Sequence, residues 1–156
     1  DAQSQISFSS SSSGRQPIPV SPSPGPHILV VDDCHVNCRM LTFMLEVIGY
    51  NNVDTCIDGQ AAIRLFGKKG SRYQTVLTDF HVGAMKGDAL VASLRSLEKV
   101  RSRPRLKIIG MTGDDSVTAA TWQGVDAVLH KPFSRKQLEQ LMLIDEASTV
   151  CTLKVP

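Results

Sequence analysis

The sequence ILVVDD, at residues 28–33, places two carboxylates directly after four consecutive aliphatic residues. A strand that is apolar on both faces is typical of a parallel sheet covered by helices on each side. Further short apolar runs of this kind occur at residues 53–57, 75–77, 106–111 and 127–129. We therefore predict five buried strands, with the first ending at the carboxylate pair.

Amphipathic patterns separate these strands and predict helices. The apolar stripes are Met40, Leu41, Met44, Leu45 and Ile48, ended by Gly49; Ala62, Ile63 and Phe66, ended by Gly67; Leu90, Val91, Leu94 and Leu97; a weaker fourth at Val117, Ala120 and Thr121; and Leu138, Leu141 and Met142. Five successive strand–helix units predict a doubly wound α/β domain with helices on both faces of the sheet. Ligands of such domains bind beyond the carboxyl ends of the strands.

The regular pattern covers only part of the chain. Residues 1–26 include nine Ser, five Pro and two Gly, a composition too poor in apolar side chains to offset the entropy of ordering. We predict a linker over residues 1–26, one domain over 27–144 and a tail or second linker over 145–156. Because the first residue is Asp and not Met, we expect a segment of a longer protein.

The composition excludes several function classes. The 156 residues are 42% apolar with a net charge of +2, which gives no electrostatic case for binding nucleic acid or anionic lipid. No apolar run approaches the roughly 18 residues of a membrane span, and no signal peptide is visible. Four cysteines without a CxxC pair favour a reduced, cytoplasmic protein.

Polar side chains follow the predicted strands at one edge of the sheet. Asp32 and Asp33 follow the first strand, Asp79 the third, Thr112 the fourth and Lys131 the fifth. Any one of these alone is explained as a helix cap, a turn residue or a solvated lysine. Three neighbouring carboxylates repel one another unless a cation lies among them, and Mg²⁺ suits such oxygen ligands. The set fits an aspartate nucleophile for a phosphoryl group, with a hydroxyl and an amine as donors to its oxygens.

Four motifs occur in order along the chain: ILVVDD; VLTDF, followed by Met85-Lys86-Gly87; IIGMTG; and VLHKPF. Together they resemble the receiver domain of two-component response regulators over residues 27–144, most closely the receivers of hybrid sensor histidine kinases. The resemblance implies a flavodoxin-like fold, with a five-stranded parallel sheet in the order 2-1-3-4-5 and five helices.

The resemblance also implies a role for each site residue. Asp79 would be the phosphoacceptor, and Asp33 and Asp79 would bind Mg²⁺ directly, with Asp32 acting mainly through water. The backbone carbonyl of His81 would complete the protein ligands. Lys131 and Thr112 would contact the phosphoryl group. The family's Lys-Pro peptide, here Lys131-Pro132, is typically cis, and Phe133 would pack under the last helix.

The implied partner is a histidine kinase or a histidine phosphotransfer domain that donates the phosphoryl group. The segment would assist its own phosphorylation, as a monomer, with no nucleic acid or membrane contact of its own. If the segment comes from a hybrid kinase, its parent would be a histidine kinase, with or without a membrane anchor.

Some positions depart from the family pattern. Val82-Gly83 replaces the usual Met-Pro after the phosphoacceptor, and Val128 stands where an aromatic switch residue is common. His81, two residues after Asp79, would alter the lifetime of the phosphoryl group. These departures leave open a degenerate receiver that only binds a partner. A phosphatase of the haloacid dehalogenase type is disfavoured, because Asp32 and Asp33 are adjacent and no Asp-x-Asp follows the first strand.

Three further features can be explained by packing or solvation, and the first also by function. A basic cluster between the third helix and the fourth strand is either a solvated loop or a docking surface; its members are Lys99, Arg101, Arg103, Arg105 and Lys107. Cys34 and Cys38 share a helix face beside His35, but too few ligands surround them for a metal site. Trp122 is expected to pack in the core.

Overall fold

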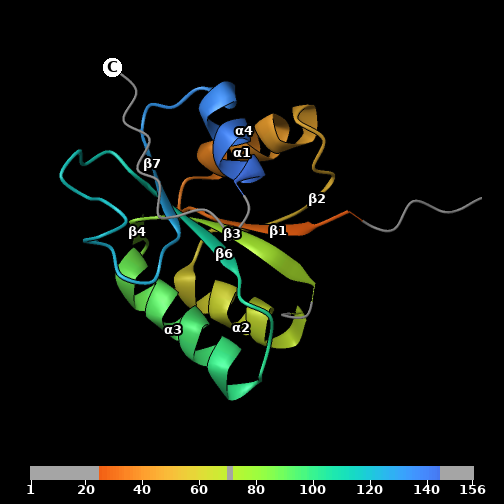
Figure 1. Ribbon diagram of the computed structural model, residues 1–156, viewed down its shortest axis with the longest axis vertical. Coiled ribbons are helices and arrows are strands. Elements are labelled where there is room, and N and C mark those ends of the chain that lie inside the picture. The colour runs from red at the N-terminus through yellow and green to blue at the C-terminus, as the bar shows by residue number, and fades with distance from the viewer. Residues whose placement is uncertain (1–24, 70–71, 145–156) are drawn as a thin grey trace, which may run out of the picture.

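The computed structural model describes residues 25–69 and 72–144 (Figure 1). In chain order the elements are β1 (His27–Val31), α1 (His35–Val47), β2 (Asn52–Cys56), α2 (Gly59–Lys69), β3 (Tyr73–Asp79), β4 (His81–Val82), β5 (Met85–Lys86), α3 (Gly87–Val100), β6 (Lys107–Thr112), β7 (Ala127–His130) and α4 (Arg135–Leu143). Nearly all of the predicted linker and all of the predicted tail lie outside these residues, so the three-part division stays a prediction.

Five parallel strands form one sheet in the order β2-β1-β3-β6-β7. Counted among themselves, these strands have the order 2-1-3-4-5, which confirms the predicted doubly wound topology. β1 lies between β2 and β3, with Val30 opposite Thr55 of β2 and Leu77 of β3. The carboxyl ends of β1 and β3 are therefore neighbours, and this adjacency brings Asp32 close to Asp79.

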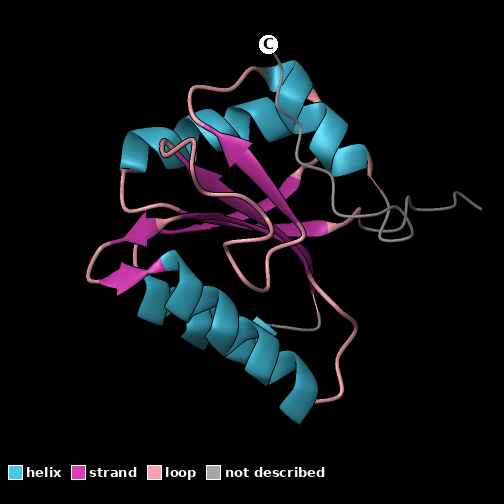
Figure 2. Cartoon of the chain, turned by 60° about the vertical axis from the view of Figure 1, so that its left-hand side comes forward, coloured by secondary structure: helices cyan, strands magenta, loops and turns pink. Residues whose placement is uncertain are grey.

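Helices cover both faces of the sheet, as Figures 1 and 2 show: α1 and α4 lie on one face, and α2 and α3 on the other. Successive residues of β1 point into different cores because side chains alternate along a strand. Ile28 and Val30 pack with residues of α1 and α4, whereas Leu29 and Val31 pack with residues of α2 and α3. Burial on both faces explains the uninterrupted apolar run.

The predicted fourth helix is wrong. Between β6 and β7, residues 113–126 form turns, so the described residues contain four helices and not five. The side chains of Thr118 and Thr121 accept hydrogen bonds from each other's backbone N–H groups, which competes with helical hydrogen bonding. The short antiparallel pair β4–β5 was also not predicted.

The predicted end of α2 at Gly67 is also wrong, since the helix continues to Lys69. The guanidinium of Arg101 donates to the carbonyl oxygen of Gly67 at 2.6 Å, and that of Arg103 to the carbonyl oxygen of Phe66 at 3.5 Å. These side chains satisfy carbonyls near the helix end, so no glycine cap is needed there.

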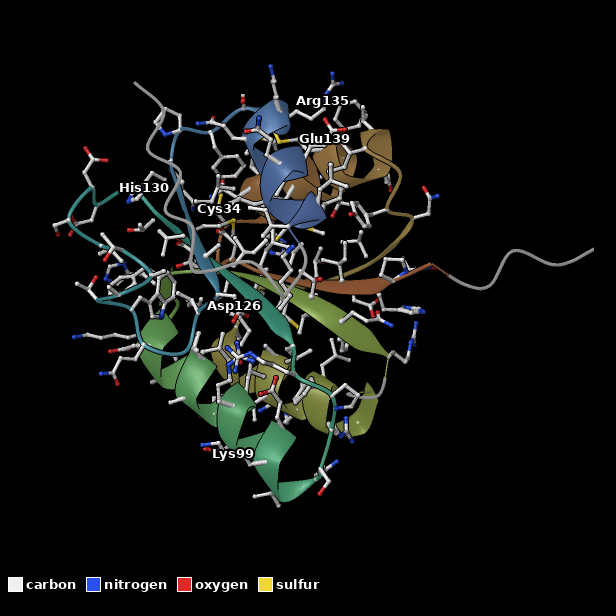
Figure 3. The ribbon with its side chains drawn as sticks, in the orientation of Figure 1. Cys34, Lys99, Asp126, His130, Arg135 and Glu139 are labelled. Carbon is white, nitrogen blue, oxygen red and sulfur yellow. The ribbon has the colours of Figure 1, made fainter. Side chains whose placement is uncertain are left out.

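The basic cluster binds the chain's own oxygens. Arg101 and Arg103 bind carbonyl oxygens of α2, as described above. In addition, Arg105 contacts Asp126 at 2.5 Å, and Lys107 donates to the carbonyl oxygen of Met142 at 3.0 Å. Asp126 also pairs with Arg95 of α3, whose guanidinium contacts Glu98 as well. Figure 3 shows Asp126 between the sheet and α3, with Lys99 on the outer side of that helix. Four of the five side chains thus bind oxygens of the domain itself, while Arg101 and Arg105 remain exposed to solvent, and the docking surface stays a prediction.

Ser134 is the N-cap of α4, and replacing it tests how much this cap stabilises the domain. Its hydroxyl accepts from the Gln137 N–H at 3.2 Å, and the Gln137 side chain accepts from the Ser134 N–H at 2.7 Å, a capping box. We expect Ser134→Ala to lower the free energy of unfolding by about 1 kcal/mol. Urea unfolding would measure this, with Ser96→Ala on the exposed side of α3 as the control. Equal stability of the two variants would contradict the cap.

No helix in the described ranges 25–69 and 72–144 is both long and apolar enough to cross a membrane.

Candidate functional site

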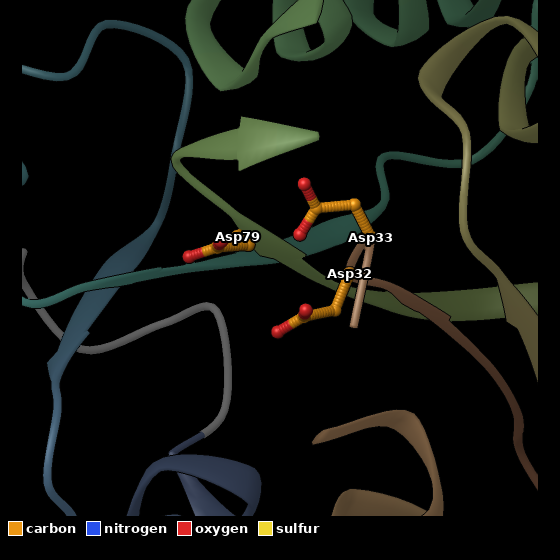
Figure 4. Close-up of side chains that lie close together, drawn as sticks. All are labelled: Asp32, Asp33 and Asp79. Carbon is orange, nitrogen blue, oxygen red and sulfur yellow. The ribbon is translucent and has the colours of Figure 1, made fainter. Parts of the chain in front are cut away.

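Three carboxylates meet at the carboxyl edge of the sheet (Figure 4). Asp32 and Asp33 follow β1 directly, and Asp79 is the last residue of β3. One oxygen of each carboxylate lies within 4.8 Å of the others. Because like charges this close repel one another, the arrangement favours a cation among them. The structure thus brings together the three acids that the sequence places at strand ends.

Asp32 is fully buried, at 0% exposure, and its carboxylate is enclosed by donors. The Cys34 N–H donates to Oδ1 at 2.9 Å, and the Asn37 amide donates to Oδ2 at 3.2 Å. Lys131 Nζ lies 3.2 Å from Oδ2. A buried carboxylate requires such partners. The sequence reasoning assigned no role to Asn37, although its position on the first turns of the following helix could have indicated one.

Lys131 joins two of the acids. Its Nζ lies 3.1 Å from Asp79 Oδ1 as well as 3.2 Å from Asp32 Oδ2. Burial by itself would lower the pKa of Lys131, but the hydrogen bond and charge of Asp79, followed by those of Asp32, outweigh it and raise the pKa. The ammonium therefore stays charged between the two carboxylates.

Asp33 is exposed and accepts a hydrogen bond from the Gly83 N–H at 3.3 Å. Gly83 lies between β4 and β5 with a φ of +61°, which glycine adopts without steric cost. Its neighbour Val82 is fully buried in the core. The departure at Val82-Gly83 thus makes a defined turn that contacts the acidic cluster.

Thr112 ends β6, the strand beside β3, and is buried. Its Oγ1 accepts from the Asp114 N–H at 3.0 Å, so its own O–H remains available to donate. The residue after Asp79 is also fixed by that strand, because the Phe80 N–H donates to the Met111 carbonyl oxygen at 2.9 Å. His81 follows on the exposed side, and its carbonyl as a metal ligand stays a prediction.

The remaining predictions near the site concern packing. The Lys131-Pro132 peptide is cis, and Phe133 packs against the core that includes Leu138 and Leu141 of α4. Cys38 is buried, and its Sγ donates to the Asp32 carbonyl oxygen at 3.3 Å. Burial and then the charge of Asp32 raise the pKa of the Cys38 thiol. His130 ends β7, and its Nε2 bonds the Val117 carbonyl oxygen at 2.9 Å.

The raised pKa of Lys131 makes part of the stability depend on pH. A group with a raised folded pKa contributes stability below its unfolded pKa, about 10.4 for lysine, and loses it as the pH rises through the folded pKa. We expect the stability difference between the native chain and Lys131→Met to be constant up to about pH 10 and to shift against the native chain above it. Urea unfolding from neutral to alkaline pH measures it; a difference independent of pH would contradict the pairing.

A doubly wound sheet that gathers three carboxylates, a hydroxyl and an ammonium at its carboxyl edge defines a class of phosphoryl-accepting signalling domains. Residues 28–143 match the family model of the response regulator receiver domain. The chain therefore belongs to the response regulator receiver family, the receivers of two-component and phosphorelay signalling.

Its relatives include free-standing receivers and receivers within larger kinases. The chain is 30% identical over 113 residues to the chemotaxis protein CheY-3 of Vibrio cholerae, covering 72% of this chain and 85% of that protein. It is 29% identical over 119 residues to hybrid signal transduction histidine kinase L of Dictyostelium discoideum, covering 74% of this chain but only 7% of the kinase.

Two similar solved structures come from histidine kinases. One is the receiver domain of a Pseudomonas aeruginosa sensor histidine kinase with a magnesium ion in its active-site cleft, at 30% identity and a TM-score of 0.64, covering 76% of this chain and 94% of that one. The other is the receiver of the Arabidopsis thaliana histidine kinase CKI1 complexed with Mg²⁺ and BeF₃⁻, at 27% identity and a TM-score of 0.64, covering 76% and 87%.

Proposed function

We propose that this receiver accepts a phosphoryl group from a phosphohistidine onto Asp79, with Mg²⁺ held among Asp32, Asp33, Asp79 and the His81 carbonyl. The observation that carries the proposal is the bridge made by Lys131, whose Nζ contacts both Asp79 and the buried Asp32. Through this bridge Asp79 is paired with a cation. The Lys131 ammonium can then contact an anionic group that becomes bound to Asp79. The magnesium found in the Pseudomonas receiver supports the choice of metal.

The chain's own groups divide the work of the transfer. An Asp79 carboxylate oxygen forms the new bond to phosphorus while the phosphorus–nitrogen bond of the phosphohistidine breaks, and the imidazole leaves with the electron pair. The Thr112 hydroxyl and the Lys131 ammonium donate to the phosphoryl oxygens. Bound Mg²⁺ would offset the negative charge of the transferred group and of the acids.

The degenerate receiver is the competing proposal. Against it, the five predicted site side chains all lie at the carboxyl ends of parallel strands, and the Gly83 N–H donates to Asp33 despite the altered loop. The cytoplasmic location and the monomeric state stay predictions from the sequence.

Intact-mass analysis with a small phosphodonor separates the two proposals. We expect the chain to gain one phosphoryl group in the presence of Mg²⁺ and none when a chelator removes the metal. No adduct, together with no bound beryllofluoride (a phosphoryl mimic), would leave only the binding module.

The exposed face of α1 supports a protein as the phosphodonor. Val36, Met40, Phe43 and Val47 are exposed apolar residues at helical spacing along it, with Phe43 at 65% exposure. The helix begins two residues after Asp33, so a partner seated on this stripe lies beside the acidic cluster. We propose that the phosphohistidine-bearing domain docks there.

Phe43→Ser tests this docking. We expect it to slow transfer from a phosphohistidine donor by about tenfold or more, as loss of an apolar anchor does, while transfer from the small phosphodonor is unchanged. Val100→Ser removes a residue of 82% exposure at the far end of α3 and is the matched control. If both variants slow the protein donor equally, the donor does not bind along α1.

A further inference from the structure

The segment 113–126, which replaces a helix between β6 and β7, is attached to the phosphoryl site at three points. The Asp114 N–H bonds the Thr112 hydroxyl at 3.0 Å, and the Val117 carbonyl oxygen bonds His130, the neighbour of Lys131, at 2.9 Å. The third point is Trp122, which packs edge-to-face against Phe80, the neighbour of Asp79. Each anchor is a site residue or is adjacent to one in sequence.

Trp122 is the largest of these contacts. Its ring centroid lies 4.8 Å from that of Phe80 at an interplanar angle of 89°, and the residue is 1% exposed. Two glycines make room for the indole. A Cβ on Gly87 would lie 2.5 Å from the indole Cζ2 and 2.8 Å from the Asp79 carbonyl oxygen, and a Cβ on Gly110 would lie 2.5 Å from the indole Cε3. The indole is therefore fitted against the backbone that carries the phosphoacceptor.

The residues after Asp79 also contact α3 and one another. The Phe80 carbonyl oxygen accepts from the Gly87 N–H at 2.6 Å, and the ring of His81 lies edge-on to the ring of Phe80 at 5.0 Å. A displacement of the turn after Asp79 would move the Phe80 ring and so change its contact with Trp122. The reverse holds too, because coupling between two sites is reciprocal.

An unpaired polar atom of Trp122 favours a second position of its side chain. Its Nε1 is buried and has no hydrogen-bond partner among the described residues. An unpaired buried donor costs free energy that a shifted position could recover by bonding the N–H. Val128, by contrast, is an aliphatic side chain enclosed in the core. It has no polar atom that could gain a hydrogen bond in a second position.

We propose that Trp122 is a positioning residue that couples phosphorylation of Asp79 to the conformation of residues 113–126, through its edge-to-face contact with Phe80. The inference rests on the proposed function, since it requires that Asp79 accept the phosphoryl group. The segment would be the part of the receiver that changes shape, held in one arrangement without the phosphoryl group and shifted towards another with it.

Beryllofluoride with Mg²⁺ gives the test on the whole chain. Fluorine NMR reports whether beryllofluoride binds, and the emission of Trp122, the single tryptophan of the chain, reports its surroundings. Amide hydrogen exchange reports the 113–126 segment. In the native chain we expect a shifted emission and a change in exchange of about fivefold or more, the lower range for coupled sites.

Phe80→Leu removes the ring contact, and Phe66→Leu, a buried aromatic packed between α2 and the sheet, is the matched control. Both should bind beryllofluoride, but the exchange response should fall below about twofold only in Phe80→Leu. An equal response in Phe80→Leu and the native chain would overturn the coupling, and Thr112 alone would then transmit the change. Unchanged emission in the native chain would overturn it as well, and this measurement needs no variant to fold. Absence of bound beryllofluoride in the native chain would instead overturn the proposed function, and the coupling with it.

Discussion

Asp79→Asn is expected to take up no phosphoryl group from any donor. The carboxamide lacks the anionic oxygen that forms the bond to phosphorus, so incorporation should fall by at least about a thousandfold. The change also removes one of three carboxylates whose oxygens lie within 4.8 Å of each other. Because this relieves repulsion while Lys131 keeps its contact with Asp32, the variant should be at least as stable as the native chain without Mg²⁺.

Intact mass and urea unfolding measure these two effects. Asp115→Asn, an exposed carboxylate in the 113–126 segment, is the control and should incorporate the phosphoryl group normally. An adduct on Asp79→Asn that maps to another residue would contradict the assignment of the phosphoacceptor. A large loss of stability would show that the missing adduct reflects misfolding and not chemistry.

Gly110→Ala is expected to lower the free energy of unfolding by about 3 kcal/mol. This is the upper end of the cost of overpacking a core and the lower end of the cost of losing a buried aromatic side chain. Gly110 lies inside β6, where the indole of Trp122 occupies the space of a side chain. A methyl group there overlaps the ring, so either the strand shifts or Trp122 leaves the core. Urea unfolding measures the change, with Gly113→Ala as control, because a Cβ at Gly113 would meet nothing within 4 Å.

A double-variant experiment assigns the cause. In a chain that already carries Trp122→Leu, the cost of Gly110→Ala should shrink to about 1 kcal/mol or less, because contacting residues are not additive. If the cost stays the same, the glycine is needed for the strand itself and the indole is not the reason.

The sheet and the acidic site could be predicted because both depend on short-range patterns. A strand buried on both faces is apolar throughout, as at Ile28–Val31, and its end is the first polar residue. Parallel strands then bring Asp32 and Asp79 to the same edge whatever the details of packing. The Lys131 bridge follows from the same rule, since β7 ends at the same edge.

The features that the sequence did not predict depend on contacts between distant residues. Gly67 does not end α2 because arginines more than thirty positions later bind the last carbonyls. The segment 113–126 has enough apolar residues for a weak helical stripe, but Thr118 and Thr121 bond each other's backbone. The space that admits Trp122 comes from glycines in β6 and α3, which no local pattern connects with it.

The attachment of residues 113–126 by separate side-chain contacts has a consequence for divergence among related chains. A helix tolerates insertions poorly, because every added residue rotates the face that packs on the sheet. A segment tied at Asp114, Val117 and Trp122 can change length or composition between its ties without disturbing them. We expect this segment to be the place where the receiver accepts inserted peptides and where homologous receivers acquire new specificities, while the sheet beneath stays the same.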